Sequence, residues 1–258
     1  MWSIPILTYH KISCDKEIGL TTISPNKFKS QLEIIINQQY HFTSFKKLNS
    51  SEYRSIKPII ITFDDGYESI HRHAFPVMQK LNLTGVIFIV ADYIGKKNTW
   101  ESYSLQRKFD HLTRDQLVEL RNAGFEIGSH SRRHLYLNNK SERVLKTETE
   151  DSKKIIEDIL GEEIITFCYP FGNYNQRVLN AVREAGYKFA MGNAKFRHYS
   201  HFPNLNLSRR TIYSLDSEKI VMNKIKTYPY HGISFLSEWV IQRGALANIY
   251  RQNLMKYQ

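Results

Sequence analysis

The sequence contains little cysteine and no long apolar run. Its 258 residues include two cysteines, Cys14 and Cys168, too few for a disulfide framework, so a reducing compartment fits at least as well as an oxidising one. No stretch approaches the roughly 20 apolar residues of a membrane-spanning helix. The opening residues, MWSIPILTYHKIS, lack the basic and apolar regions of a signal peptide. These absences predict a cytoplasmic protein that does not span a membrane.

Acidic residues are outnumbered by basic ones. The chain has 36 Lys and Arg against 25 Asp and Glu, which gives a formal net charge of +11. Such a surplus favours an anionic partner, either nucleic acid, an acidic glycan or the headgroups of a membrane. The sequence has no zinc finger, helix-turn-helix or RNA-binding signature, and its basic residues are scattered. We therefore expect no nucleic-acid partner.

Segments typical of strands and of helices alternate along the chain. Apolar and β-branched runs predict the strands, while capping residues and helical periodicity predict the helices. No internal repeat interrupts this order. Alternation of this kind is typical of an α/β fold in which helices surround parallel strands, most simply a (β/α) barrel. The predicted strands are 4–9, 58–63, 84–90, 125–130, 164–170 and 187–192, and the predicted helices are 24–39, 70–81, 113–124, 141–160 and 175–185.

Polar clusters follow several of these strands. They are Tyr9-His10, Asp64-Asp65, Ser129-His130 and the segment 169–172 with the sequence YPFG. In barrels of this class the carboxyl ends of the strands gather on one face, which carries the functional groups. We therefore expect these clusters to converge on one pocket.

Two adjacent carboxylates at the end of a buried strand need a compensating charge. Asp64 and Asp65 repel each other, and both resist leaving water. His130 and His134, four residues apart, supply two imidazoles. Two imidazoles and one carboxylate make a catalytic metal site with an open position for water. The second aspartate is then available as the general base that takes a proton from this water.

Three motifs carry a resemblance to a known family. TFDDGY, HSRRH and CYPFG, in this order, resemble the polysaccharide deacetylases of the NodB-homology fold, carbohydrate esterase family 4, over residues 4–213. The resemblance implies a distorted (β/α) barrel that uses a divalent metal to remove acetyl groups from N-acetylated sugars. It makes Asp64 the base and Asp65, His130 and His134 the metal ligands. Zn²⁺ is the expected ion, with Co²⁺, Ni²⁺ and Fe²⁺ as alternatives.

The sequence departs from the usual family pattern at two points. Cys168 stands where the family has an arginine that tethers the base, and the late Leu-x-His motif with the acid histidine has no match. The sequences LTYHKI and FCYPFGNYN resemble the branch of poly-N-acetylglucosamine deacetylases, which implies that His10 is the general acid. In the same branch, LSRRTI implies that Arg209, or Arg210 in the alternative register, supplies the lost positive charge. The alternative for His10 is a histidine packed beside Tyr9.

Further residues are candidates for substrate contacts. A backbone N–H near Phe171 is expected to face the oxyanion. Asn173 and Tyr174 are expected to line the sugar site, with a simple turn as the alternative. Tyr67 is expected to pack on the sugar ring or to lie in the core. Gly66 is expected to adopt a positive φ.

The sequence suggests a substrate and a domain division. We expect a catalytic domain over 1–213 and a helical extension over 214–258 that packs on the barrel or docks on an anionic membrane surface. The expected substrate is an N-acetylhexosamine, with GlcNAc favoured, in a glycan such as a lipid-linked lipopolysaccharide or capsule intermediate at the inner membrane face. The alternatives are a deacetylase of an exported polymer or peptidoglycan, a glycan-binding pseudoenzyme, and an iron oxygenase.

Overall fold

A computed structural model describes residues 4–14, 20–48, 56–99, 108–193 and 202–227. Within these ranges parallel strands close into a barrel, because β5 pairs with β6 on one side and with β1 on the other. The predicted α/β barrel is thus confirmed. Around the barrel the strands are β1 (Ile6–Tyr9), β10 (Leu207–Thr211), β9 (Phe189–Asn193), β8 (Thr166–Cys168), β7 (Glu126–Ser129), β6 (Val86–Ile89) and β5 (Lys57–Phe63).

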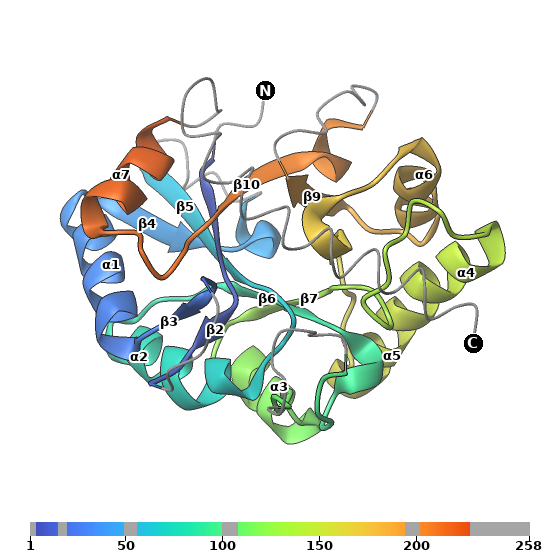
Figure 1. The fold of residues 1–258 in the computed structure, drawn as a ribbon, viewed down its shortest axis with the longest axis horizontal. Helices are drawn as coiled ribbons and strands as arrows, with labels where there is room; N and C mark the ends of the chain where they lie inside the picture. Colours follow the sequence, from blue (N-terminus) through green and yellow to red (C-terminus); the bar gives the residue numbers. More distant parts are fainter. Residues whose placement is uncertain (1–3, 15–19, 49–55, 100–107, 194–201, 228–258) are drawn as a thin grey trace.

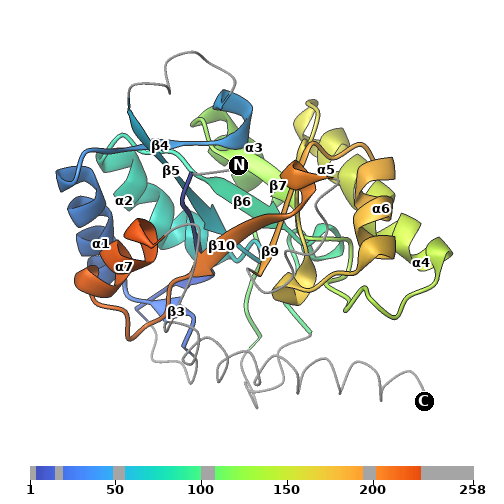
Figure 2. The same ribbon diagram turned by 90° about the horizontal axis from the view of Figure 1, so that it is seen from above.

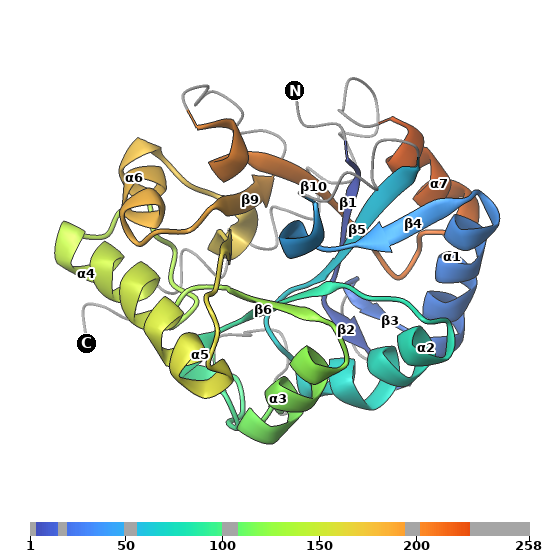
Figure 3. The same ribbon diagram turned by 180° about the vertical axis from the view of Figure 1, so that it is seen from behind.

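Four strands are not among those predicted. Strand β4 (Tyr40–Thr43) pairs with the first half of β5, whose second half pairs with β6; this distortion is visible in Figure 3. Strand β10 joins β9 to β1 and so closes the barrel. The short strands β2 (Lys11–Ile12) and β3 (Thr22–Ile23) form a separate pair.

Helices surround the strands on most sides (Figure 1). The predicted caps are confirmed: Ser24 accepts a hydrogen bond from the backbone N–H of Lys27, and Thr113 and Gln116 form a capping box. Two predicted helices contain a wide π-turn, at Ile70–Ala74 and Thr147–Asp151. No described helix is long and apolar enough to cross a membrane. The helices are α1 (Pro25–Asn37), α2 (Phe75–Lys80), α3 (Arg114–Asn122), α4 (Glu142–Lys146), α5 (Ser152–Leu160), α6 (Gln176–Glu184) and α7 (Glu218–Lys226).

The inside of the barrel explains which residues reach its mouth. One apolar cluster draws most of its members from β1, β5, β6, β8, β9 and β10, so it fills the interior. It includes Ile60 of β5 and Leu207 of β10. Because side chains alternate along a strand, residues two or four positions apart face the same way. Asp64 follows Ile60 by four positions, and Arg209 follows Leu207 by two. This periodicity directs Asp64 and Arg209 into the carboxyl-end mouth of the barrel.

Helix α7 packs beside α1 (Figure 2). Lys224 of α7 forms a buried ion pair with Asp216 at 2.5 Å, and the Asp216 carbonyl accepts a hydrogen bond from Gln31 of α1. The first part of the predicted extension is therefore a helix attached to the barrel. The rest of the predicted extension, residues 228–258, lies outside the described residues, and the boundary at 213/214 stays a prediction.

Replacing Lys224 with Met is expected to lower the free energy of unfolding by roughly 3–5 kcal/mol, because the Asp216 carboxylate stays buried without its cation. Urea unfolding followed by circular dichroism would measure the change. The control is Lys219→Met on the exposed side of the same helix, for which we expect a change within about 0.5 kcal/mol. Equal losses in the two variants would contradict this role of the ion pair.

Candidate active site

The two adjacent aspartates at the end of β5 point in different directions. Asp65 and Gly66 both have left-handed backbones, with φ of 70° and 71°. The positive φ expected for Gly66 is confirmed, and a Cβ at this position would lie 2.9 Å from the Ile89 side chain. The left-handed turn rotates Asp65 away from the direction of Asp64. The neighbouring carboxylates thus face different partners.

Asp65 faces both predicted histidine ligands. Its Oδ1 lies 3.5 Å from Nε2 of His130 and 3.4 Å from Nε2 of His134. All three residues are buried, and their donor atoms lie within 4.8 Å of one another. A tetrahedral ion with bonds of about 2.1 Å needs donors roughly 3.4 Å apart. The donor set therefore fits a small divalent cation such as Zn²⁺.

The histidines are held in a state suited to binding a metal. Nδ1 of His130 donates a hydrogen bond to the Cys168 carbonyl at 2.8 Å, which leaves the lone pair of Nε2 toward Asp65. Burial lowers the pKa of His130 to about 4 and holds the pKa of His134 well below its usual value. Both rings are therefore neutral near pH 7, the form that binds a metal ion.

Asp64 is paired with Arg209. The guanidinium donates two hydrogen bonds, from Nη1 to Oδ1 at 2.6 Å and from Nη2 to Oδ2 at 2.5 Å. Burial raises the pKa of the Asp64 carboxyl, but the charge and hydrogen bonds of Arg209 outweigh burial and hold this pKa well below its ordinary value. Asp64 is therefore ionised near neutral pH, as a general base must be.

Cys168 lies on the other side of Asp64. Its Sγ is 3.8 Å from each carboxylate oxygen, so Asp64, His130 and Cys168 form a second group of nearby potential ligands. Both oxygens of Asp64 already accept hydrogen bonds from Arg209. Burial also raises the pKa of the Cys168 thiol well above its usual value, and the protonated thiol is a poor ligand. The group containing Asp65 is thus the better metal site.

His10 stands beside the same carboxylate. Its Nε2 lies 3.9 Å from Oδ2 of Asp64, and its side chain is 23% exposed. The structure thus brings the predicted acid to the predicted base at the mouth of the barrel. The role of His10 as a proton donor stays a prediction.

Phe171 and Asn173 lie on the histidine side of the site. Phe171 has a left-handed backbone with φ of 59°, and its ring centroid is 4.7 Å from that of His134. Asn173 accepts a hydrogen bond from Asn138 at 3.1 Å and lies 3.5 Å from the Tyr136 hydroxyl. Tyr136 and Asn138 were not predicted, because no motif distinguishes them from other loop residues. These side chains contact one another beside His134, and the expected role of Asn173 in the sugar site stays a prediction.

Two predicted sugar contacts belong to the core instead. Tyr67 is 1% exposed and its ring packs against Phe109 and His111. Tyr174 is 3% exposed, stacks on Tyr169 and donates a hydrogen bond to Asn206. Tyr67 thus takes the core position that was its stated alternative, and Tyr174, which was expected to line the sugar site, is covered by protein side chains instead.

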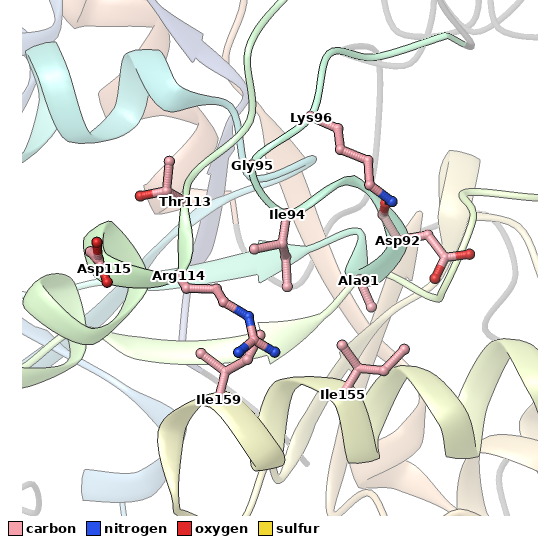
Figure 4. Close-up of a pocket in the computed structure, with 10 residues that line it drawn as sticks. All are labelled: Ala91, Asp92, Ile94, Gly95, Lys96, Thr113, Arg114, Asp115, Ile155 and Ile159. Atoms are coloured by element: carbon pink, nitrogen blue, oxygen red, sulfur yellow. The ribbon is translucent and has the colours of Figure 1, made fainter.

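A hollow of about 480 Å³ lies outside this site. It is bounded by the turn Ala91–Tyr93 after β6, the start of α3, and α5. Figure 4 shows both α5 isoleucines pointing into this hollow, Ile155 below Ala91 and Ile159 beside Arg114. None of the predicted site residues lines it.

Comparison with known proteins agrees with the family resemblance of the motifs TFDDGY, HSRRH and CYPFG. A family model described as polysaccharide deacetylase matches residues 52–190. The chain is 29% identical over 192 residues to Bacillus subtilis YxkH, covering 73% of this chain and 63% of that protein. It is 25% identical over 189 residues to the poly-beta-1,6-N-acetyl-D-glucosamine N-deacetylase of Staphylococcus aureus, covering 69% and 63%. The chain thus spans 63% of the length of these curated relatives.

Solved structures show the same fold. The Streptococcus pyogenes deacetylase PplD matches with a TM-score of 0.73 at 24% identity, covering 87% of this chain and 98% of that one. IcaB from Ammonifex degensii matches with a TM-score of 0.71 at 21% identity, covering 87% and 97%. Since the family model covers more than half of the sequence, this chain belongs to the polysaccharide deacetylase family.

Proposed function

We propose that this protein hydrolyses the N-acetyl group of an N-acetylhexosamine, with GlcNAc favoured, within a glycan. The observation that carries the proposal is the divergence of the two aspartates. Asp64 is ionised and oriented by Arg209, while Asp65 faces His130 and His134. This difference supports proton transfer as the role of Asp64 and binding of a cation as the role of Asp65. Family membership supports the same chemistry.

The residues divide the steps of amide hydrolysis among them. Asp65, His130 and His134 would hold a divalent ion, which supplies Lewis-acid polarisation of the carbonyl and of water. Asp64 takes a proton from the water that attacks the acetyl carbon. His10 donates a proton to the sugar nitrogen as the carbon–nitrogen bond breaks. The products are acetate and a free amine on the sugar.

The pairing of Arg209 with Asp64 favours an enzyme over a glycan-binding pseudoenzyme. The pseudoenzyme alternative rests on Cys168, which stands where the family arginine is expected. Arg209 reaches Asp64 from β10 with two hydrogen bonds, so the carboxylate has a cationic tether from another strand.

Acetate release would test the proposal. The substrates are N-acetylglucosamine oligomers and a lipid-linked glycan extract, each with native protein, chelator-treated protein and treated protein reloaded with Zn²⁺. We expect release by native and reloaded protein and loss of release after chelation. Absence of release from both substrates by Zn²⁺-loaded protein would argue against the proposed reaction on them.

The finer substrate is a separate proposal. The net charge of +11 supports a glycan carried by an anionic membrane, such as a lipid-linked lipopolysaccharide or capsule intermediate. Faster release from the lipid-linked extract than from free oligomers is expected on this proposal. A cytoplasmic location at the inner membrane face belongs to the same proposal, and recovery of the native protein from the periplasm or medium would contradict it.

A further inference from the structure

The loop that carries both histidine ligands has an unusual backbone. Between His130 and His134 the chain forms no helix or strand, and Ser131 and His134 have left-handed φ values of 67° and 58°. Non-glycine residues adopt this conformation at a cost that the surrounding structure has to offset. The two imidazoles converge on Asp65 only while the loop keeps this shape.

The hydrogen bonds of the loop show what holds it. The N–H of His130 donates to the carbonyl of Ile89 at 2.8 Å. The N–H groups of Ser131 and His134 donate to serine hydroxyls of the same segment, Ser129 Oγ and Ser131 Oγ. The two N–H groups between them, those of Arg132 and Arg133, point away from these partners. Both donate to a single carboxylate from a distant part of the chain.

That carboxylate is Glu148, in the π-turn Thr147–Asp151. Its Oε2 accepts the N–H groups of Arg132 at 3.1 Å and Arg133 at 2.9 Å. Its Oε1 accepts Nε of Arg133 at 2.7 Å. The residue is 0% exposed, so the carboxylate cannot exchange these donors for water. The π-turn is a widened helical turn of the kind often found at functional sites.

We propose that Glu148 is a positioning residue for the metal centre, which sets the affinity for a divalent ion by holding the histidine loop in shape. This inference rests on the proposed function, because it takes Asp65, His130 and His134 as the ligands. The hydrogen bonds of Glu148 go to Arg132 and Arg133 and not to the three ligands. It acts through the backbone of the loop, as residues that orient metal ligands do.

The test measures metal binding rather than activity. Zn²⁺ affinity is determined by competition with a chromogenic chelator, and Co²⁺ absorption reports the coordination geometry. For Glu148→Ala we expect affinity lower by about 10–100-fold and an altered Co²⁺ spectrum. Glu148→Gln preserves the size of the side chain and keeps an amide oxygen for the two N–H groups. It is expected to bind with intermediate affinity, and it tests the proposal if the alanine variant does not fold.

Glu150→Gln is the matched control. Glu150 lies in the same π-turn, but it forms an ion pair with Lys146 at 3.6 Å rather than with the loop. We expect the Zn²⁺ affinity and the Co²⁺ spectrum of the Glu150→Gln variant to equal those of the unmodified protein. Folded Glu148 variants that bind like the unmodified protein would overturn the inference and leave the proposed function standing. Failure of the unmodified protein to bind either ion would instead remove the metal site on which both depend.

Discussion

Replacing Asp64 with Asn is expected to lower kcat by about 10²–10⁴-fold, the usual contribution of a general base, while Zn²⁺ still binds. The amide has nearly the shape of the carboxylate but does not accept the proton of the attacking water. The metal-site donors belong to other residues, Asp65, His130 and His134. Acetate release and chelator competition on the same preparation would separate the two effects.

The neighbouring substitution Asp65→Asn is the matched control for this experiment. It makes the same chemical change one residue along the chain, and asparagine tolerates the left-handed backbone at this position. We expect this variant to lose most of its Zn²⁺ affinity, and its activity with it. If both variants lost the metal equally, or if Asp64→Asn kept the full rate, the assigned division of roles would be wrong.

Replacing Arg209 with Met is expected to reduce both stability and activity. Removing one partner of a buried, hydrogen-bonded ion pair lowers the free energy of unfolding by roughly 3–5 kcal/mol. Burial raises the pKa of Asp64, and the charge of Arg209 makes the largest opposing contribution, which lowers this pKa. Without Arg209 this pKa rises, so Asp64 is protonated at a higher pH and the acid limb of the kcat/KM profile moves to higher pH. Urea unfolding and the pH dependence of acetate release would measure the two effects.

Arg210 provides the control on the same strand. It is also buried, at 3% exposed, but as the next residue along β10 it points to the opposite face. Arg210→Met is therefore expected to leave the acid limb unmoved, whatever its effect on stability. Arg209→Lys keeps the charge without the bidentate geometry and should lie between Met and the unmodified protein. An equal shift of the acid limb in the Arg209→Met and Arg210→Met variants would contradict the assignment of Arg209.

Most of the barrel and the polar clusters at its mouth could be predicted from local patterns. An apolar run, a capping serine or a glycine in a turn acts within a few residues, so local sequence was enough to predict the positive φ of Gly66, the helix caps and the strands β1, β5, β6, β7, β8 and β9. The motifs likewise singled out Asp64, Asp65, His130 and His134, which the fold brings close together. Strand β10 was not among the predicted strands, because its short run contains two arginines and resembles a polar loop.

Contacts between distant segments depended on how the barrel closes. Arg209 meets Asp64 across 145 positions of sequence, and the choice of Arg209 over Arg210 follows from which face of β10 turns inward. The burial of Tyr67 and Tyr174 depends on neighbours contributed by other segments. Glu148 lies in the charged run TETED, which resembles a solvated helix face, until the π-turn brings it under the histidine loop. Spacing along a chain determines local structure, whereas the closure of the barrel and its side-chain packing determine which polar groups meet.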